Sequence, residues 1–263
     1  MDLGLKGKRA LVSGSSRGLG FATALELAKE GCDICINSRN LEKLETAEQR
    51  IAAQANSNVY SICADIAQID SAEMVVAEAA EKMNGLDILV TNSGGPPSGS
   101  FESFDDQAWH AAIELNFLSH MRLVRAALPF LRKSDAASVL TITSMSVKQP
   151  VPNLVLSNSV RSATVGLTKT LALELGTQGI RFNSILPGWT ETERVQELMA
   201  FRAKTNQTTI EEEIAKQSLD SPFNRLATPQ EFANVAVFLV SPAAAYVTGS
   251  MLVVDGGMYK ATY

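Results

Sequence analysis

The sequence predicts an α/β fold in which a parallel sheet of about seven strands carries helices on both faces. Short apolar runs alternate with longer segments of helical periodicity, as in consecutive βαβ units. Several short runs, such as Ile88-Leu89-Val90, are apolar without interruption, which is typical of strands buried on both faces. With 46% hydrophobic and 19% charged residues, the 263-residue chain has the composition of a globular protein with a large core.

The first two βα units are predicted from the N-terminus onward. A strand is expected over residues 8–13, where an apolar run ends at a glycine-rich loop. The helix expected over 18–30 ends at Gly31, because glycine favours helix termination. A strand over 33–37 and a helix over 41–55 follow with the same two periodicities.

The middle of the chain continues this alternation. A strand is expected over 59–64, and the helix predicted over 71–83 ends at an Asn-Gly pair. The next strand covers 86–91. One long helix is expected over 105–131, with an Asp-Asp pair as its N-terminal cap.

The C-terminal part supplies the remaining strands. A strand is predicted over 138–143, a helix over 157–176, and a strand over 180–186 that a Pro-Gly pair ends. A helix begins at Thr228, because Thr-Pro-Gln-Glu is a capping box with proline at the first helical position. A short strand over 251–255 completes the sheet.

Residues 190–226 interrupt this rhythm with a polar, partly helical insertion after a strand's carboxyl end. Ligands bind at that end of parallel sheets, so we expect a substrate lid, with a surface excursion as the alternative. There is no linker, and residues 1–263 are expected to form a single domain.

Composition and charge limit the possible partners. The net charge of −5 argues against a nucleic-acid or anionic-membrane partner, both of which usually need a basic face. Without a signal peptide or an apolar run long enough to span a bilayer, the cytoplasm is the expected location. Cys32 and Cys35 are expected to be structural thiols on opposite faces of a strand, and no metal site is expected.

The loop Ser13-Gly14-Ser15-Ser16-Arg17-Gly18-Leu19-Gly20 joins the first predicted strand to the first helix. Glycines at such a junction let the backbone approach a pyrophosphate, which then rests on the helix N-terminus. The context therefore predicts a dinucleotide site in a Rossmann-type, doubly wound sheet. The spacing is G-x-x-x-G-x-G.

This loop resembles that of the short-chain dehydrogenase/reductase family, and the resemblance extends over nearly the whole chain. Family-like motifs follow in order: Asp65-Ile66, Asn92-Ser93-Gly94-Gly95, Asn116, Ser144, Pro187-Gly188 with Thr190 and Thr192, and Asp255-Gly256-Gly257. The resemblance points to 3-oxoacyl-carrier-protein reductases and to sugar or polyol dehydrogenases. It implies a small carbonyl or alcohol substrate and a homo-oligomer, either a tetramer or a dimer.

The cofactor is expected to be NADP(H) in preference to NAD(H). NAD-binding sites place an acid about twenty residues past the loop, and this sequence has Asn37-Ser38-Arg39 there. Arg39 and Arg17 suit a 2′-phosphate, although both could instead be solvated. The expected cofactor-binding residues are Gly14, Ser16, Arg17, Gly18, Leu19, Gly20, Asn37, Ser38, Arg39, Asp65, Ile66, Asn92, Ser93, Gly94, Arg161, Pro187, Gly188, Thr190 and Thr192.

The family's catalytic tyrosine and lysine are absent. The run from Ala163 to Ala172 matches the family without a gap, which puts Ser157 at the tyrosine position and Arg161 at the lysine position. Serine is a far weaker acid than tyrosine, and arginine stays protonated at working pH. Ser144, Asn116, Ser157 and Arg161 are the expected catalytic residues.

Three interpretations of this change remain open. In the first, the protein is an NADP(H)-dependent oxidoreductase with a different proton donor, in which Ser144 polarises the carbonyl and Arg161, a water or Lys148 stabilises the developing oxyanion charge. In the second, the protein binds the cofactor as a sensor or partner subunit and does not catalyse a redox reaction. The third possibility is a cofactor-dependent reaction without net redox.

Two further sets of residues are ambiguous in the sequence. Trp189 either lines the pocket or packs in the core. His110 and His120 lie too far apart on one helix for a metal pair.

Overall fold

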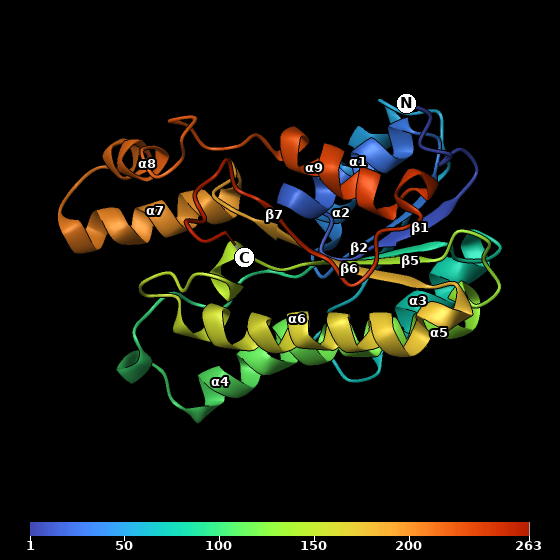
Figure 1. Ribbon diagram of the computed structural model, residues 1–263, viewed down its shortest axis with the longest axis horizontal. Helices are drawn as coiled ribbons and strands as arrows, with labels where there is room; N and C mark the ends of the chain where they lie inside the picture. The colour runs from blue at the N-terminus through green and yellow to red at the C-terminus, as the bar shows by residue number, and fades with distance from the viewer. Residues whose placement is uncertain (263) are drawn as a thin grey trace.

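The computed structural model describes residues 1–262 and confirms the predicted α/β fold, with seven parallel strands in one sheet (Figure 1). The strands are β1 (Arg9–Val12), β2 (Asp33–Ser38), β3 (Val59–Cys63), β4 (Ile88–Thr91), β5 (Ser138–Ile142), β6 (Arg181–Pro187) and β7 (Met251–Val254). Their order across the sheet is β3-β2-β1-β4-β5-β6-β7. The chain builds outward from β1 to β3 and then returns to place β4 beside β1. The crevice at the carboxyl ends of β1 and β4 is therefore where such a sheet binds a ligand.

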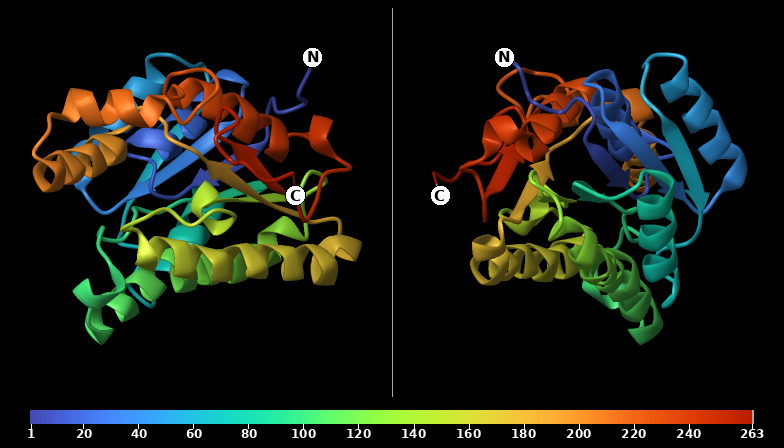
Figure 2. Two further views of the ribbon diagram at one scale, coloured as in Figure 1. Left: turned by 60° about the vertical axis from the view of Figure 1, so that its left-hand side comes forward. Right: turned by 90° about the vertical axis from the view of Figure 1, so that its right-hand side faces the viewer.

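Helices cover both faces of the sheet (Figure 2). They are α1 (Gly18–Lys29), α2 (Leu41–Ala52), α3 (Ser71–Lys82), α4 (Asp106–Ile113), α5 (Ser119–Leu131), α6 (Val155–Leu175), α7 (Glu193–Asn206), α8 (Ile210–Ser218) and α9 (Pro229–Val240). Helices α1, α2 and α9 pack on one face, and α3, α5 and α6 pack on the other. Cys32 and Cys35 are both buried and belong to the cores on opposite faces, as predicted.

The long helix predicted over 105–131 is helical from Asp106 to Leu131, but it is not α-helical throughout. Asp105 caps it as expected, accepting a hydrogen bond from the backbone N–H of Ala108. A π-helical segment, Glu114–Leu118, then separates α4 from α5. Such a segment adds one residue to a turn while both flanks stay helical, so hydrophobic periodicity does not reveal it.

Other helix boundaries agree more closely with the sequence. Helix α9 begins at Pro229, and the Thr228 and Glu231 side chains form the predicted capping box. Helix α6 begins at Val155, two residues before the predicted start. Within residues 1–262, no helix has the length and apolarity needed to cross a bilayer.

The insertion after β6 forms two helices, α7 and α8, that project from the body of the protein (Figure 1). Its two ends are fastened together, because the N–H of Glu191 donates to the Ala227 carbonyl and the N–H of Ala227 donates to the Trp189 carbonyl. The insertion also has its own small apolar core, centred on Val195, Met199 and Leu226. It is therefore an ordered element that stands beside the carboxyl edge of the sheet.

Candidate active site

The loop between β1 and α1 can be built only with glycine at two of its positions. A Cβ on Gly14 would lie 2.7 Å from the Asn92 carbonyl oxygen, and one on Gly20 would lie 2.5 Å from the Gly14 carbonyl oxygen. Both distances are shorter than real Cβ contacts. Asn92 fastens the loop to β4, since its Nδ2 donates to the Gly14 carbonyl oxygen over 2.9 Å. The loop is thus held with the N-terminus of α1 facing the crevice.

The crevice contains a cavity of about 560 Å³ that most of the predicted site residues line. These are Gly14, Ser16, Arg17, Gly18, Leu19, Asn37, Ser38, Arg39, Asp65, Ile66, Asn92, Ser93, Gly94, Ser144, Ser157, Arg161, Pro187, Gly188, Thr190 and Thr192. Two predicted residues, Gly20 and Asn116, do not line it. Gly20 lies beneath the loop, and Asn116 is only 1% exposed behind the strand-end residues.

One end of this cavity is basic and has no acid at the end of β2. Arg39 lies beside Asp65, with Nη1 and Oδ2 3.8 Å apart, and its side chain is 74% exposed. Arg17 pairs with Glu197 of α7 over 3.3 Å. The Ser16 hydroxyl donates to the Ser38 hydroxyl over 2.9 Å. Two exposed guanidinium groups and two hydroxyls therefore converge where an adenosine ribose would lie.

The other end contains Ser144, Ser157 and Arg161. Ser157 and Arg161 are one turn apart on α6 and are 8% and 7% exposed. Arg161 Nη1 donates to the backbone carbonyls of Ile142 and Thr143 at the end of β5, over 3.3 and 3.2 Å. Burial, and then the charge of Arg194, lowers the pKa of Arg161 to about 10, so the group is cationic at neutral pH.

Ser144 stands where β5 ends, with its hydroxyl free to donate. Its Oγ accepts the backbone N–H of Ser146 over 3.1 Å. Because a hydroxyl both accepts and donates, this bond leaves the Ser144 proton available for an oxygen in the cavity.

Asn116 lies behind the cavity wall and holds it through hydrogen bonds. Its Nδ2 donates to the Ser93 hydroxyl and to the Gly94 carbonyl, each over 2.8 Å. His120 reinforces the same wall, with Nε2 3.1 Å from the Ser93 hydroxyl and Nδ1 3.0 Å from the Thr91 hydroxyl. Burial lowers the pKa of His120 to about 3, so the imidazole is neutral and both contacts are ordinary hydrogen bonds.

The other singled-out residues have structural surroundings. His110 is exposed and its Nδ1 lies 2.8 Å from the Asp106 carbonyl, far from a metal-binding arrangement. No group of metal-binding side chains occurs among residues 1–262. Lys148 does not line the cavity, and its Nζ lies 5.3 Å from the centre of the Tyr259 ring. Trp189 lines the cavity and also packs on the core of the insertion.

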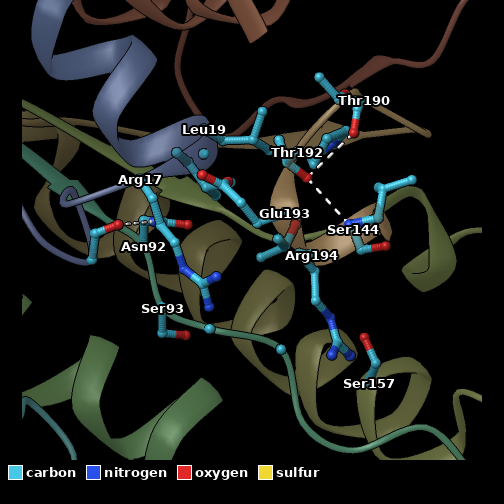
Figure 3. A pocket seen from close by; sticks show the side chains of 18 of the residues that line it. Arg17, Leu19, Asn92, Ser93, Ser144, Ser157, Thr190, Thr192, Glu193 and Arg194 are labelled. Atoms are coloured by element: carbon cyan, nitrogen blue, oxygen red, sulfur yellow. Dashed lines mark hydrogen bonds between the residues drawn. The ribbon is translucent and has the colours of Figure 1, made fainter. Parts of the chain in front are cut away.

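Sequence reasoning missed Arg194, whose side chain reaches from the first turn of α7 toward Ser157 (Figure 3). Its Nη2 donates to the Pro96 carbonyl oxygen over 2.6 Å. The signal was available in principle, because Arg194 lies two residues after Thr192, at a helix start that follows a strand's carboxyl end. The sequence predicts a polar lid here, but it does not indicate which side chain of the lid turns inward.

The cavity suits a dinucleotide. Helix α1 directs its free backbone N–H groups at the loop where a pyrophosphate binds, and a Cβ built on Gly94 would project into open space. The cavity runs from the basic end to Ser144 and Ser157.

Comparisons with known proteins agree with this arrangement. The family model described as enoyl-(acyl carrier protein) reductase matches residues 14–259. Human "Dehydrogenase/reductase SDR family member 4" is 32% identical over 254 residues, covering 96% of this chain and 88% of the human protein. The 3-oxoacyl-[acyl-carrier-protein] reductase FabG of Staphylococcus aureus is 28% identical, covering 96% of this chain and 98% of its own.

Solved structures extend the likeness to the whole fold. The L-sorbose reductase of Gluconobacter frateurii, complexed with NADPH and L-sorbose, is 31% identical with a TM-score of 0.94, covering 99% of this chain and 100% of its own. Actinorhodin polyketide ketoreductase with NADPH is 28% identical with a TM-score of 0.91, covering 95% and 97%. The chain therefore belongs to the short-chain dehydrogenase/reductase family of oxidoreductases.

Proposed function

We propose that the protein is an NADP(H)-dependent reductase of a small carbonyl compound, with an atypical arrangement for proton supply. The observation that carries this proposal is the continuous cavity from the Arg17 and Arg39 end to Ser144, Ser157 and Arg161. Relatives whose structures contain NADPH support the choice of cofactor. Arg17 and Arg39 would hold a 2′-phosphate through charge-assisted hydrogen bonds.

The residues of this chain would then polarise the carbonyl oxygen and deliver its proton. A bound reduced nicotinamide supplies the hydride for the carbonyl carbon. The Ser144 hydroxyl donates to the carbonyl oxygen, and the Arg161 guanidinium stabilises the negative charge that develops on it. Arg161 does not give up its own proton at neutral pH, so the proton that completes the alcohol comes from water. Ser157 can pass that proton along a hydrogen bond, but its aliphatic hydroxyl does not act as the acid.

A second candidate is a cofactor-binding protein without turnover, and one contact favours it. The Thr164 hydroxyl donates to the Asn116 backbone carbonyl over 2.6 Å. In the resembling family this asparagine supports a relay water, and here its carbonyl already has a partner within the fold. That bond takes one of the two acceptor sites of the carbonyl, so a relay water at this point would have to share the oxygen with Thr164.

A turnover assay separates the two candidates. The protein is mixed with NADPH and a panel of ketones, sugars and β-ketoacyl thioesters, and absorbance of the reduced nicotinamide is followed. Under the reductase proposal at least one carbonyl is turned over, and Ser144→Ala lowers the rate about 100-fold while NADPH still binds. Ser162→Ala is the matched control, because this exposed α6 hydroxyl lies outside the cavity.

The opposite result identifies the binding protein. Tight NADPH binding with no turnover of any carbonyl would refute the reductase proposal. A gain of turnover in Ser157→Tyr combined with Arg161→Lys would then show that only the acid–base pair is missing. Tighter binding of NADH than of NADPH would refute the proposed cofactor preference.

The remaining proposals concern the whole molecule. We propose that residues 190–226 act as a lid, that the protein is a cytoplasmic homo-oligomer, and that residues 1–263 form one NADP(H)-binding domain. Protection of the 190–226 segment from proteolysis by NADPH would support the lid. Light scattering that gives the mass of a dimer or a tetramer would support the oligomer, and a monomer mass would refute it.

A further inference from the structure

The substrate end of the cavity contains more positive charge than the protein itself neutralises. Arg161 is 7% exposed and forms no ion pair with any acid among residues 1–262; its hydrogen bonds go to two backbone carbonyls. A buried cation without an anionic partner is unfavourable, so such a site gains free energy when an anion enters.

Arg194 adds a second cation from the opposite wall of the same cavity. Its charge is close enough to lower the pKa of Arg161 further. Figure 3 shows its guanidinium directed at Ser157, one turn before Arg161 on α6. The two arginines therefore face the same space from α6 and α7.

The acid nearest Arg194 compensates it only partly. Glu197 lies 3.7 Å from Arg194 and 3.3 Å from Arg17, so one carboxylate is shared between two guanidinium groups. Glu197 is also 51% exposed, and water therefore screens its attraction. Glu193 in the first turn of α7 offsets the partial positive charge of that helix N-terminus, so the uncompensated charge at this end is that of the two guanidinium groups.

Arg194 is held in position before any ligand arrives. Its Nη2 donates to the Pro96 carbonyl, and a Cβ on Gly95 would lie 2.9 Å from its Nε. The backbone after β4 thus packs against the guanidinium group, and glycine at position 95 is what leaves room for it. A group fixed in this way loses little conformational entropy on binding.

The cofactor would not neutralise Arg161. Its phosphates are expected at the glycine loop, Arg17 and Arg39. Arg17 is close enough to Arg194 for the two to share Glu197, but the Arg194 guanidinium itself is directed at Ser157. A reduced nicotinamide and its ribose carry no negative charge toward Arg161.

We infer that the substrate is an anionic oxo compound, whose carboxylate or phosphate group Arg194 and Arg161 bind beside Ser157. The inference rests on the proposed reductase function, because the anion is carried by the carbonyl substrate. Arg194 is then the specificity-determining residue, since a guanidinium fork binds carboxylate or phosphate with two hydrogen bonds.

Matched pairs of charged and neutral carbonyl compounds test this inference. The pairs are pyruvate and methyl pyruvate, acetoacetate and methyl acetoacetate, and dihydroxyacetone phosphate and dihydroxyacetone. We expect kcat/KM for the charged member of one pair to be about 10- to 100-fold higher, the range of a charge-assisted hydrogen bond. The first two pairs report a carboxylate site and the third a phosphate site.

Variants of Arg194 identify the residue responsible. Arg194→Met should lower kcat/KM for the charged member at least about tenfold more than for the neutral member, and Arg194→Lys should restore part of the preference. Lys204→Met is the matched control, because it removes a charge from an exposed position of α7. Equal losses for both members in Arg194→Met, or a preference for neutral members in the unaltered protein, would overturn the inference.

A binding measurement keeps the inference testable if no carbonyl is turned over. In that case the reductase proposal fails, and calorimetry of the three anions with the NADP⁺-loaded protein decides separately. Binding that Arg194→Met weakens at least about tenfold supports the anion site. Binding of no anion, or equal binding by both proteins, refutes it.

Discussion

Replacing Arg161 with methionine should stabilise the cofactor-free protein while weakening NADPH binding. Burial lowers the pKa of Arg161 from 12.5 to about 10. Since one pKa unit corresponds to about 1.4 kcal/mol, the charged guanidinium costs the folded state roughly 3 kcal/mol. Both folded and unfolded states are charged below pH 10, so this cost is fully present at neutral pH. It disappears as the pH rises from 10 toward 12.5.

The free energy lost with the hydrogen bonds of Arg161 is smaller than this cost of burying its charge. The substitution removes two hydrogen bonds to carbonyls. Both are long, at 3.2 and 3.3 Å, so each contributes about 1 kcal/mol, below the usual value for a charged donor. Methionine still fills the space of the aliphatic stem. The net effect is a stabilisation of roughly 1 kcal/mol, or about 2–4 °C in Tm for a chain of this size. Urea unfolding without cofactor measures it, and fluorescence titration should show NADPH binding about tenfold weaker.

Arg181→Met is the contrasting control. Arg181 donates to the carbonyls of Leu239, Val240, Ser241 and Val247 over 2.7 to 3.4 Å, away from the cavity. Removing it leaves four acceptors without that partner, so we expect about 2 kcal/mol or more of destabilisation. The reasoning about Arg161 is refuted if Arg161→Met unfolds at lower urea than the unaltered protein, with an unchanged m-value.

Three further predictions follow from other parts of the site. Arg39→Leu should weaken NADPH binding about five- to tenfold and leave NADH binding unchanged, because its 74% exposure screens the phosphate contact; equal losses in fluorescence titrations would contradict this role. Gly20→Ala should destabilise the protein by about 1–3 kcal/mol in a thermal melt, since its Cβ would collide with the Gly14 carbonyl. Gly166→Ala in the interior of α6 meets no atom within 4 Å and should instead stabilise it by about 0.5–1 kcal/mol, because alanine favours a helix interior. His120 has a pKa of about 3 in the fold against about 6.5 unfolded, so protons bind the unfolded chain first. Stability should therefore fall by about 1.4 kcal/mol per unit as the pH drops from 6.5 toward 3, and His120→Gln should lose that slope in urea titrations between pH 7 and pH 5.

The sequence predicted the sheet well because its signals are local. An apolar run such as Ile88-Leu89-Val90 between two helical segments predicts a buried strand. The glycine loop after the first strand predicts the position of the cavity. The capping box at Thr228 likewise needs only four neighbouring residues. These features depend on residues close together in the chain, so the pattern alone was enough.

The site was less predictable where it depends on the direction in which a side chain points. Arg194 and Lys148 are both cations on segments after strand ends, yet only Arg194 lines the cavity. Which of them turns inward is decided by packing, here by the Pro96 carbonyl and the space left at Gly95. Asn116 shows the same limit, because its burial behind Ser93 depends on the π-helical segment.

The π-helical segment Glu114–Leu118 affects how this helix can be redesigned. It contains one residue more than the α-helix needs, so the faces of α4 and α5 differ in phase by about 100°. A substitution scan that treats 106–131 as one helical wheel would assign inward and outward positions wrongly on one side of Asn116. Deleting a single residue there would be a larger change than most substitutions, because it would rotate α4 by about 100° relative to α5.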